Sequence, residues 1–288
     1  MFGRVMTAMV TPFKNGEVNY NEAARLSKFL VANGSDSLLV CGSTGENPTM
    51  TKEEKIKLIN TIRDSVDVPI MAGTGSFNTQ DSIDFTREVD KLGVDSFLIV
   101  TPYYNKPNQD GLYEHFKAVA GATEKPIMLY NIPGRSVREI AVDTIVKLAE
   151  IKNIRYLKAA CGNLENISLT RKSTRDDFVI YSGDDGLTLP MLSIGAVGVV
   201  SVASAIIGKE INAMIKEFEA GNILTARELH LEYFDVFKDL FCDTNPVPVK
   251  YALSKMGFDT SEVRLPMVEL NDKSKKTVDE MLKRHSLI

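Results

Sequence analysis

One lysine in the sequence stands where an amine could act as a nucleophile. Lys158 ends the short apolar run Ile154–Lys158, and burial in such a run removes the water that stabilises an ammonium charge. Burial lowers the pKa of the amine from the ~10.4 of a free lysine and leaves a neutral group that can attack a carbonyl carbon. A lysine at the end of a strand can also extend to solvent, so the residue types leave Schiff-base chemistry and a structural role both open.

Tyrosine and hydroxyl side chains end or follow other apolar runs. Tyr130 lies near the end of the run that precedes Lys158, Tyr104 follows the run 95–101, and Ser43 and Thr44 follow the run 36–41. A phenol beside an amine can exchange protons with it. Hydroxyls in a glycine-flanked turn can relay protons or hold a carboxylate, although hydroxyls are common in turns of every kind.

Histidine and metal chemistry are not indicated at these run ends. The sequence has three histidines, all in segments with helical patterns: His115, His230 and His285. The carboxylates near run ends are Glu46, Asp184 and Asp185. Each fits a hydrogen-bond acceptor in a tight turn as well as a magnesium ligand. We therefore expect no histidine acid–base group and no metal site.

The apolar runs are the strands that must position these side chains. Eight such runs, most rich in β-branched residues, recur along the chain: Val5–Thr11, Asp36–Cys41, Val68–Gly73, Asp95–Thr101, Pro126–Asn131, Ile154–Lys158, Phe178–Ser182 and Val197–Val202. Most are continuous rather than alternating, which is typical of strands buried on both faces of a parallel sheet. Amphipathic segments with helical spacing lie between them, and Thr51 followed by Glu54 is a capping-box pattern.

This alternation predicts an α/β fold, a (β/α)8 TIM barrel with a C-terminal helical extension. A doubly wound open sheet is the alternative, but the first turn, TPFKNGEV, lacks a GxGxxG sequence. No strand pattern returns after residue 202, where segments 224–241, 248–256 and 273–287 have helical patterns. We therefore expect residues 1–222 to form the barrel and 223–288 the extension. Active sites of such barrels form at the carboxyl ends of the strands.

Composition limits the classes of protein to consider. The 288 residues are 44% hydrophobic and 25% charged, with a formal net charge of −4, which is typical of a globular protein and disfavours nucleic acid as a partner. Three distant cysteines exclude a disulfide framework and fit a reducing compartment. The uncharged stretch 186–208 is long enough to span a bilayer. Its proline, serines and glycines instead favour a buried helix, a turn and a strand, so we expect a cytoplasmic protein without a membrane partner.

Taken in order, the strand-end motifs resemble the dihydrodipicolinate synthase and N-acetylneuraminate lyase family of pyruvate-dependent class I aldolases. The matching segments are GSTGE (42–46), YYNKP (103–107), YNIPGR (130–135), LK (157–158), YSGDD (181–185), GAVGVVSV (195–202), NPVPVK (245–250) and RLPMVEL (264–270). The resemblance covers essentially the whole chain. It is strongest to the synthase branch, through YYNKP, the arginine of YNIPGR and NPVPVK.

The resemblance implies an activity and a set of residue roles. Pyruvate would condense with Lys158 to form an imine, with no cofactor, and the derived enamine would attack the aldehyde of L-aspartate 4-semialdehyde. The product would be 4-hydroxy-tetrahydrodipicolinate, at the first committed step of diaminopimelate and lysine biosynthesis. The other implied roles are a proton relay of Tyr130, Ser43 and Tyr104, pyruvate carboxylate binding by Thr44, binding of the second substrate's carboxylate by Arg135, and a carbonyl of Val200 facing the lysine. The tyrosine matching Tyr104 enters the partner subunit's site in this family, which implies at least a homodimer and favours a homotetramer.

Two departures from the family pattern concern the active site. Ala159 follows the lysine where family members commonly carry an acidic residue. Ser43 stands where the synthases usually have threonine, and GSTGE is frequent among the N-acetylneuraminate lyases. A sibling aldolase that cleaves N-acetylneuraminate or a 2-keto-3-deoxy sugar acid is therefore the alternative function, although Arg135 is less suited to a neutral polyol. A catalytically silent family member is a further alternative, suggested by Ala159 alone.

The third departure concerns regulation. Feedback-inhibited synthases bind lysine through histidine and asparagine side chains, and the matching positions here are Lys52, Lys55 and Phe77, while Tyr103 is retained. A cationic, partly apolar pocket repels a cationic amino acid. We therefore expect no inhibition by L-lysine.

Overall fold

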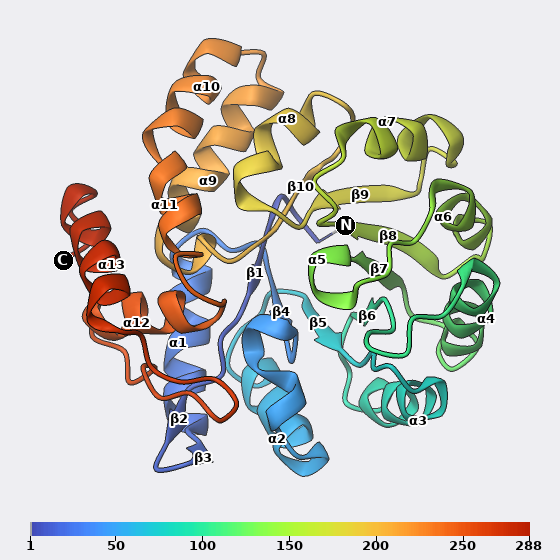
Figure 1. Cartoon of the computed structure of the whole chain (residues 1–288), viewed down its shortest axis with the longest axis horizontal. Coiled ribbons are helices and arrows are strands. Elements are labelled where there is room, and N and C mark those ends of the chain that lie inside the picture. Colours follow the sequence, from blue (N-terminus) through green and yellow to red (C-terminus); the bar gives the residue numbers. More distant parts are fainter. Residues whose placement is uncertain (1) are drawn as a thin grey trace. The chain divides into compact units, whose positions relative to one another are not determined.

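The computed structural model describes residues 2–288, whose eight parallel strands close into a barrel (Figure 1). The strands follow one another in the order β1–β10–β9–β8–β7–β6–β5–β4. Their bounds are Val5–Ala8 (β1), Ser37–Val40 (β4), Ile70–Gly73 (β5), Ser96–Val100 (β6), Ile127–Asn131 (β7), Ile154–Ala159 (β8), Val179–Ser182 (β9) and Gly198–Ser201 (β10). Each predicted apolar run contains one strand or most of one, and the predicted barrel is confirmed.

Helices connect the strands and continue the chain after the last one. The barrel helices are α1 (Tyr20–Ala32), α2 (Lys52–Arg63), α3 (Thr79–Asp90), α4 (Gln109–Ala120), α5 (Pro133–Ser136), α6 (Val142–Ala149), α7 (Leu164–Ser173), α8 (Thr188–Leu192) and α9 (Ser204–Glu219). Then come α10 (Ile223–Glu232), α11 (Phe234–Asp239), α12 (Val247–Lys255) and α13 (Asp272–Arg284). The predicted capping box is confirmed, because Thr51 and Glu54 bond each other's backbone N–H groups at the start of α2.

The structure differs from the sequence-based expectation in two places. A two-stranded antiparallel hairpin, β2 (Phe13–Lys14) and β3 (Glu17–Val18), follows β1 and was not predicted. The predicted helix 224–241 is divided at Tyr233, whose ψ of 10° departs from helical geometry. The uncharged stretch 186–208 is confirmed as helix, turn and strand, and no helix of residues 2–288 combines the length and apolar character needed to cross a membrane.

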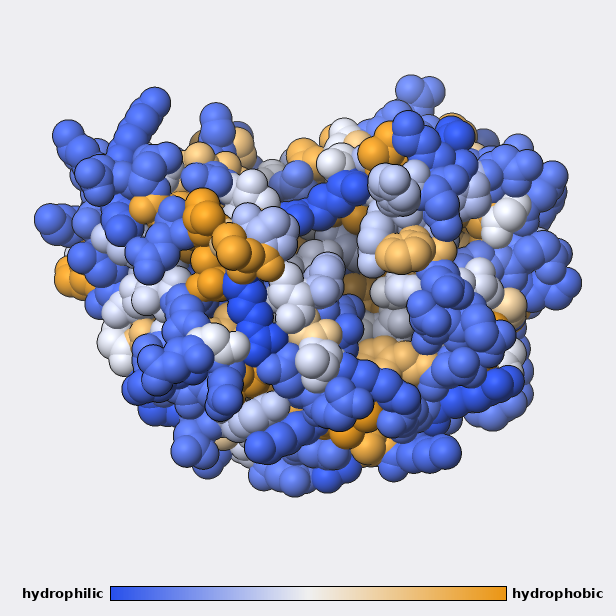
Figure 2. Space-filling view, turned by 60° about the horizontal axis from the view of Figure 1, so that its bottom comes forward, coloured by the Kyte–Doolittle hydropathy of each residue, from blue (hydrophilic) through white to orange (hydrophobic). Residues whose placement is uncertain are grey.

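The chain divides into two compact units, Met1–Pro69 with Ser201–Ile288 and Ile70–Val200. In the second unit, α3, α4, α6 and α7 follow one another around the outside of β5–β9 (Figure 1). In the first unit, α9 packs on α10 and α12 on α13. The predicted division at residues 222 and 223 stays a prediction. Hydrophilic residues predominate on the face shown in Figure 2, with hydrophobic residues in small groups.

Close packing of α9 on the end of α1 requires a glycine. A Cβ on Gly208 would lie 2.3 Å from the carbonyl oxygen of Asn33, which is rigid backbone. We predict that Gly208→Ala lowers the free energy of unfolding by about 1–3 kcal/mol because one helix must shift, as measured by denaturant unfolding. The matched control is Gly121→Ala at the end of α4, where φ is −71° and a Cβ would meet its nearest neighbour at 3.4 Å. Equal midpoints for the two variants would contradict the prediction.

Candidate active site

Lys158 is buried in β8 beside Tyr130 of β7. The strands pair in parallel with Tyr130 opposite Lys158, and each residue is only 5% exposed. The Nζ atom of Lys158 lies 4.3 Å from the centroid of the Tyr130 ring. The apolar strands thus bring together the two residues that the sequence singled out as an amine and its proton-exchanging phenol.

Burial changes the protonation of both groups in useful directions. Desolvation lowers the pKa of Lys158 to about 7; the nearby Asp185 carboxylate opposes this change and the Arg135 charge adds to it. Desolvation also raises the pKa of Tyr130 to about 12, opposed by Arg135. At neutral pH a large fraction of the amine is therefore uncharged and nucleophilic, while the phenol keeps the proton that it can donate.

The turn after β9 fits closely around the lysine side chain. The backbone N–H of Gly183 donates to the Ala159 carbonyl at 2.8 Å, which fastens the turn to β8. A Cβ on Gly183 would lie 3.0 Å from Cγ and 3.1 Å from Cε of Lys158, so a larger residue would displace the amine. The turn leads into Asp185, which is 4% exposed. Its charge acts on Lys158, and residues 2–288 contain no cluster of ligands that could hold a metal ion.

Ala159 points away from the amine. Successive strand residues face opposite sides of a sheet, and Ala159 lines a small cavity with Ile145 of α6 and Ile167 of α7. Glu139 also lines this cavity. The departure from the family pattern at this position therefore affects packing on the outside of the barrel rather than the surroundings of Lys158.

Three other predicted site residues belong to the same unit. Arg135 is an exposed residue of α5, and its charge acts on both Lys158 and Tyr130. Val200 is buried in β10, one residue beyond Val199, which lies opposite Ser182 of β9. Tyr104 has a φ of +71° and is 88% exposed, so the structure does not enclose it with the amine, and its part in a proton relay stays a prediction.

Ser43 and Thr44 belong to the other unit, in a short 3-10 turn after β4. Thr44 is 5% exposed, and its Oγ1 accepts a hydrogen bond of 2.9 Å from Nδ2 of Asn245. Two residues after Thr44, Glu46 Oε1 lies 2.5 Å from Nζ of Lys250. The joint action of Ser43 and Thr44 with Lys158 stays a prediction.

The Glu46–Lys250 ion pair is buried, and other groups of the chain contact both of its members. The side chains of Lys250 and Glu46 are 0% and 2% exposed. The backbone N–H of Arg264 donates to Glu46 at 3.1 Å, and the Phe13 ring centroid lies 4.4 Å from the Lys250 ammonium. Sequence reasoning assigned no role to Asn245 or Lys250, although Lys250 stands alone in the apolar run VPVKYAL, the same signal that identified Lys158.

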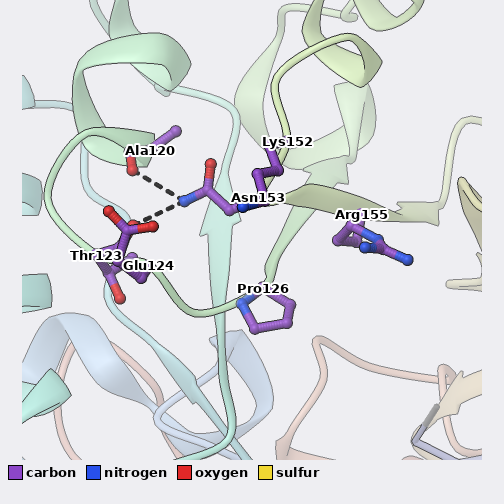
Figure 3. A pocket seen from close by; sticks show the side chains of 7 residues that line it. All are labelled: Ala120, Thr123, Glu124, Pro126, Lys152, Asn153 and Arg155. Atoms are coloured by element: carbon purple, nitrogen blue, oxygen red, sulfur yellow. Dashed lines mark hydrogen bonds between the residues drawn. The ribbon is translucent and has the colours of Figure 1, made fainter.

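A hollow of about 190 Å³ lies at the opposite end of β7 and β8 from Lys158 (Figure 3). The side-chain amide of Asn153 crosses it, donating to the carbonyls of Ala120 and Thr123 at 2.9 and 2.8 Å. The Arg155 side chain points away from Asn153 in Figure 3, and it pairs with Asp177 at 3.1 Å. Because these groups are engaged in structural bonds at the amino ends of the strands, we assign the hollow no part in the chemistry.

Comparison with known proteins gives matches over the full length. A model of the dihydrodipicolinate synthetase family matches residues 1–285. A 4-hydroxy-tetrahydrodipicolinate synthase from Desulforudis audaxviator is 49% identical over 290 residues, which cover 100% of this chain and 99% of that protein.

Solved structures of dihydrodipicolinate synthases have the same fold. The enzyme from Bacillus anthracis is 46% identical with a TM-score of 0.96, covering 98% of each chain. The enzyme from Cyanidioschyzon merolae, with lysine bound, is 44% identical with a TM-score of 0.98, covering 100% of this chain and 99% of that one. A monomeric variant of dihydrodipicolinate synthase is 38% identical with a TM-score of 0.97, covering 100% and 98%.

The lowered pKa of Lys158 predicts how imine formation depends on pH. Cyanoborohydride trapping of pyruvate on Lys158, followed by mass spectrometry, should speed up as pH rises, with a midpoint near the pKa of about 7. The reason is that only the deprotonated amine attacks a carbonyl. Asp185→Asn should move the midpoint to lower pH, because the carboxylate favours the ammonium form. The control is Asp184→Asn, which changes the exposed neighbouring carboxylate. A wild-type midpoint above pH 9 would contradict the prediction.

Proposed function

The chain belongs to the dihydrodipicolinate synthetase family, and from this premise we propose how it acts as a 4-hydroxy-tetrahydrodipicolinate synthase. The reaction condenses pyruvate with L-aspartate 4-semialdehyde. The observation that carries the chemistry is the buried amine of Lys158 beside Tyr130, with a pKa of about 7. An uncharged amine at neutral pH is the requirement of every Schiff-base aldolase.

The first half of the reaction makes a carbon nucleophile from pyruvate. The Lys158 amine adds to the keto carbon, and the carbinolamine loses water to give an imine. The phenol of Tyr130, which keeps its proton at neutral pH, donates that proton to the departing oxygen. Loss of a proton from the methyl carbon then gives the enamine. The imine itself accepts the electron pair, so we propose that no cofactor takes part.

The second half joins the two substrates and frees the lysine. The enamine carbon attacks the aldehyde carbon, and the amino group of the second substrate then attacks the imine carbon, closing the ring and expelling the Lys158 amine. In this proposal Thr44 holds the pyruvate carboxylate, Arg135 meets the carboxylate of the second substrate, and Ser43 and Tyr104 pass protons with Tyr130. The Val200 carbonyl faces the lysine.

The charge of Arg135 supports an anionic second substrate over a sugar acid chain. It acts on the electrostatics of both Lys158 and Tyr130, whereas the carbon chain of N-acetylneuraminate presents neutral hydroxyls that need no cation. The presence of Lys158 in a desolvated position likewise supports an active enzyme over a family member without catalytic activity.

We further propose a cytoplasmic enzyme that assembles at least into homodimers, with a homotetramer as the expected state. Tyr104 supports this proposal because it is 88% exposed in a left-handed backbone conformation, so it is better placed to meet a second subunit than the interior of its own barrel. Beside it in sequence, Tyr103 packs edge-on against exposed Phe77 at 5.3 Å.

The proposed activity predicts aldehyde-dependent consumption of pyruvate. We expect turnover when pyruvate and L-aspartate 4-semialdehyde are supplied together, measured by coupling the product to an NADPH-dependent reductase. Lys158→Ala should reduce turnover by about three orders of magnitude or more, because the nucleophile is removed. Lys152→Ala, at an exposed lysine near the start of the same strand, is the matched control. Trapping of pyruvate without aldehyde-dependent turnover, together with cleavage of N-acetylneuraminate, would reverse the choice of substrate.

L-Lysine should leave the initial rate unchanged. The positions that bind lysine in feedback-inhibited synthases carry Lys52 and Lys55 of α2 and the exposed ring of Phe77. The positive charges of Lys52 and Lys55 repel the ammonium groups of free lysine. The measurement is the initial rate at subsaturating pyruvate with increasing L-lysine, with L-norleucine, which lacks the side-chain ammonium group, as the control. Half-inhibition by submillimolar lysine would contradict the prediction.

A further inference from the structure

We propose that Asn245 is a positioning residue for this reaction, which turns the hydroxyl proton of Thr44 toward the carboxylate of the bound α-keto acid. The inference rests on the proposed function, because it takes the carboxylate to be the ligand of Thr44. It adds a residue from the C-terminal part of the chain to the substrate site.

The observation behind the proposal is a buried side-chain hydrogen bond between distant parts of the sequence. Nδ2 of Asn245 lies 2.9 Å from Oγ1 of Thr44, across 201 positions of the chain. Each of these residues is 5% exposed. Because water is excluded from this bond, the amide and the hydroxyl determine each other's orientation.

The chemistry of the two groups fixes the direction of the hydroxyl proton. A threonine hydroxyl has one proton to donate and two lone pairs. The amide nitrogen of asparagine only donates, so Thr44 accepts in this bond and its own proton remains available for another acceptor. A carboxylate only accepts, which makes it the natural recipient.

A second bond from the same segment holds the turn that carries Thr44. Lys250 Nζ pairs with Glu46 Oε1 at 2.5 Å, and Thr11 Oγ1 donates to the Gly45 carbonyl at 2.7 Å. The turn is thus held by the two residues that follow Thr44. The bond from Asn245 in turn restricts rotation of the Thr44 O–H bond.

The test measures half-saturation by pyruvate in cyanoborohydride trapping on Lys158, which needs no second substrate. Asn245→Asp should raise the half-saturating pyruvate concentration about tenfold or more. The new carboxylate would accept a hydrogen bond from the Thr44 hydroxyl, which would then no longer donate to the substrate, and its negative charge would repel the substrate carboxylate. Asn245→Ala should raise it about two- to fivefold, because the proton loses its fixed direction. Asn271→Asp is the control for added charge, since Asn271 caps α13 at the surface and aspartate caps equally well.

A double-mutant cycle separates positioning from a merely structural role. In a Thr44→Val background, Asn245→Ala should have no further effect on half-saturation, because the group through which it acts is absent. Full additivity of the two changes would overturn the inference. It would also be overturned if Asn245→Asp, or Asn245→Ala should the aspartate variant not fold, left half-saturation at the wild-type value. Failure of the wild-type enzyme to trap pyruvate would instead overturn the proposed function.

Discussion

Desolvation of one amine, that of Lys158, is the constraint on which the proposed chemistry depends. Moving the pKa of Lys158 from 10.5 to about 7 corresponds to about 5 kcal/mol of disfavoured protonation. The unfolded chain holds that proton more tightly, so at acidic and neutral pH the lysine lowers the free energy of unfolding. This loss of stability decreases as pH rises from about 7, the pKa in the folded protein, to 10.5, the pKa in the unfolded chain. Burial of the apolar side chains of the paired strands must therefore stabilise the fold by more than the buried lysine destabilises it.

A second buried lysine shows the opposite solution to the same physical problem. At Lys158 the Asp185 carboxylate offsets only part of the effect of burial, and in the proposed mechanism the amine becomes a nucleophile by giving up its charge. Burial lowers the pKa of Lys250 as well, but the Glu46 carboxylate at 2.5 Å counteracts this change. A buried ammonium that is paired with a carboxylate keeps its proton and does not act as a nucleophile, so it serves to hold two segments of the chain together. The contrast explains why a lone lysine in an apolar run is an ambiguous signal: the partner that decides between the two outcomes can be 204 positions away.

Much of the architecture follows from local sequence, and the exceptions have physical causes. The strands and the buried Lys158, the candidate nucleophile, are recognisable because an apolar run of residues is a local property of the sequence. The β2–β3 hairpin was missed although Asn15-Gly16, both with positive φ, is a hairpin-turn signal; its strands have two residues each, too few to show a pattern. The break at Tyr233 and the bond between Asn245 and Thr44 depend on tertiary packing, which neither propensity nor spacing records.

The long sequence separation of the Asn245–Thr44 bond has a consequence for how the enzyme comes into being. On a ribosome that adds about 5–20 residues per second, the turn carrying Thr44 is made about 10–40 s before Asn245, which lies 201 positions later. Only in the last part of that interval, after residue 201, does the nascent chain hold all eight strands, and it then still lacks the Asn245 side chain that bonds this hydroxyl. If Asn245 orients Thr44 as proposed, the substrate site lacks this positioning group until residue 245 has been added, so a chain that stops between residues 201 and 245 has all eight strands but an incomplete site.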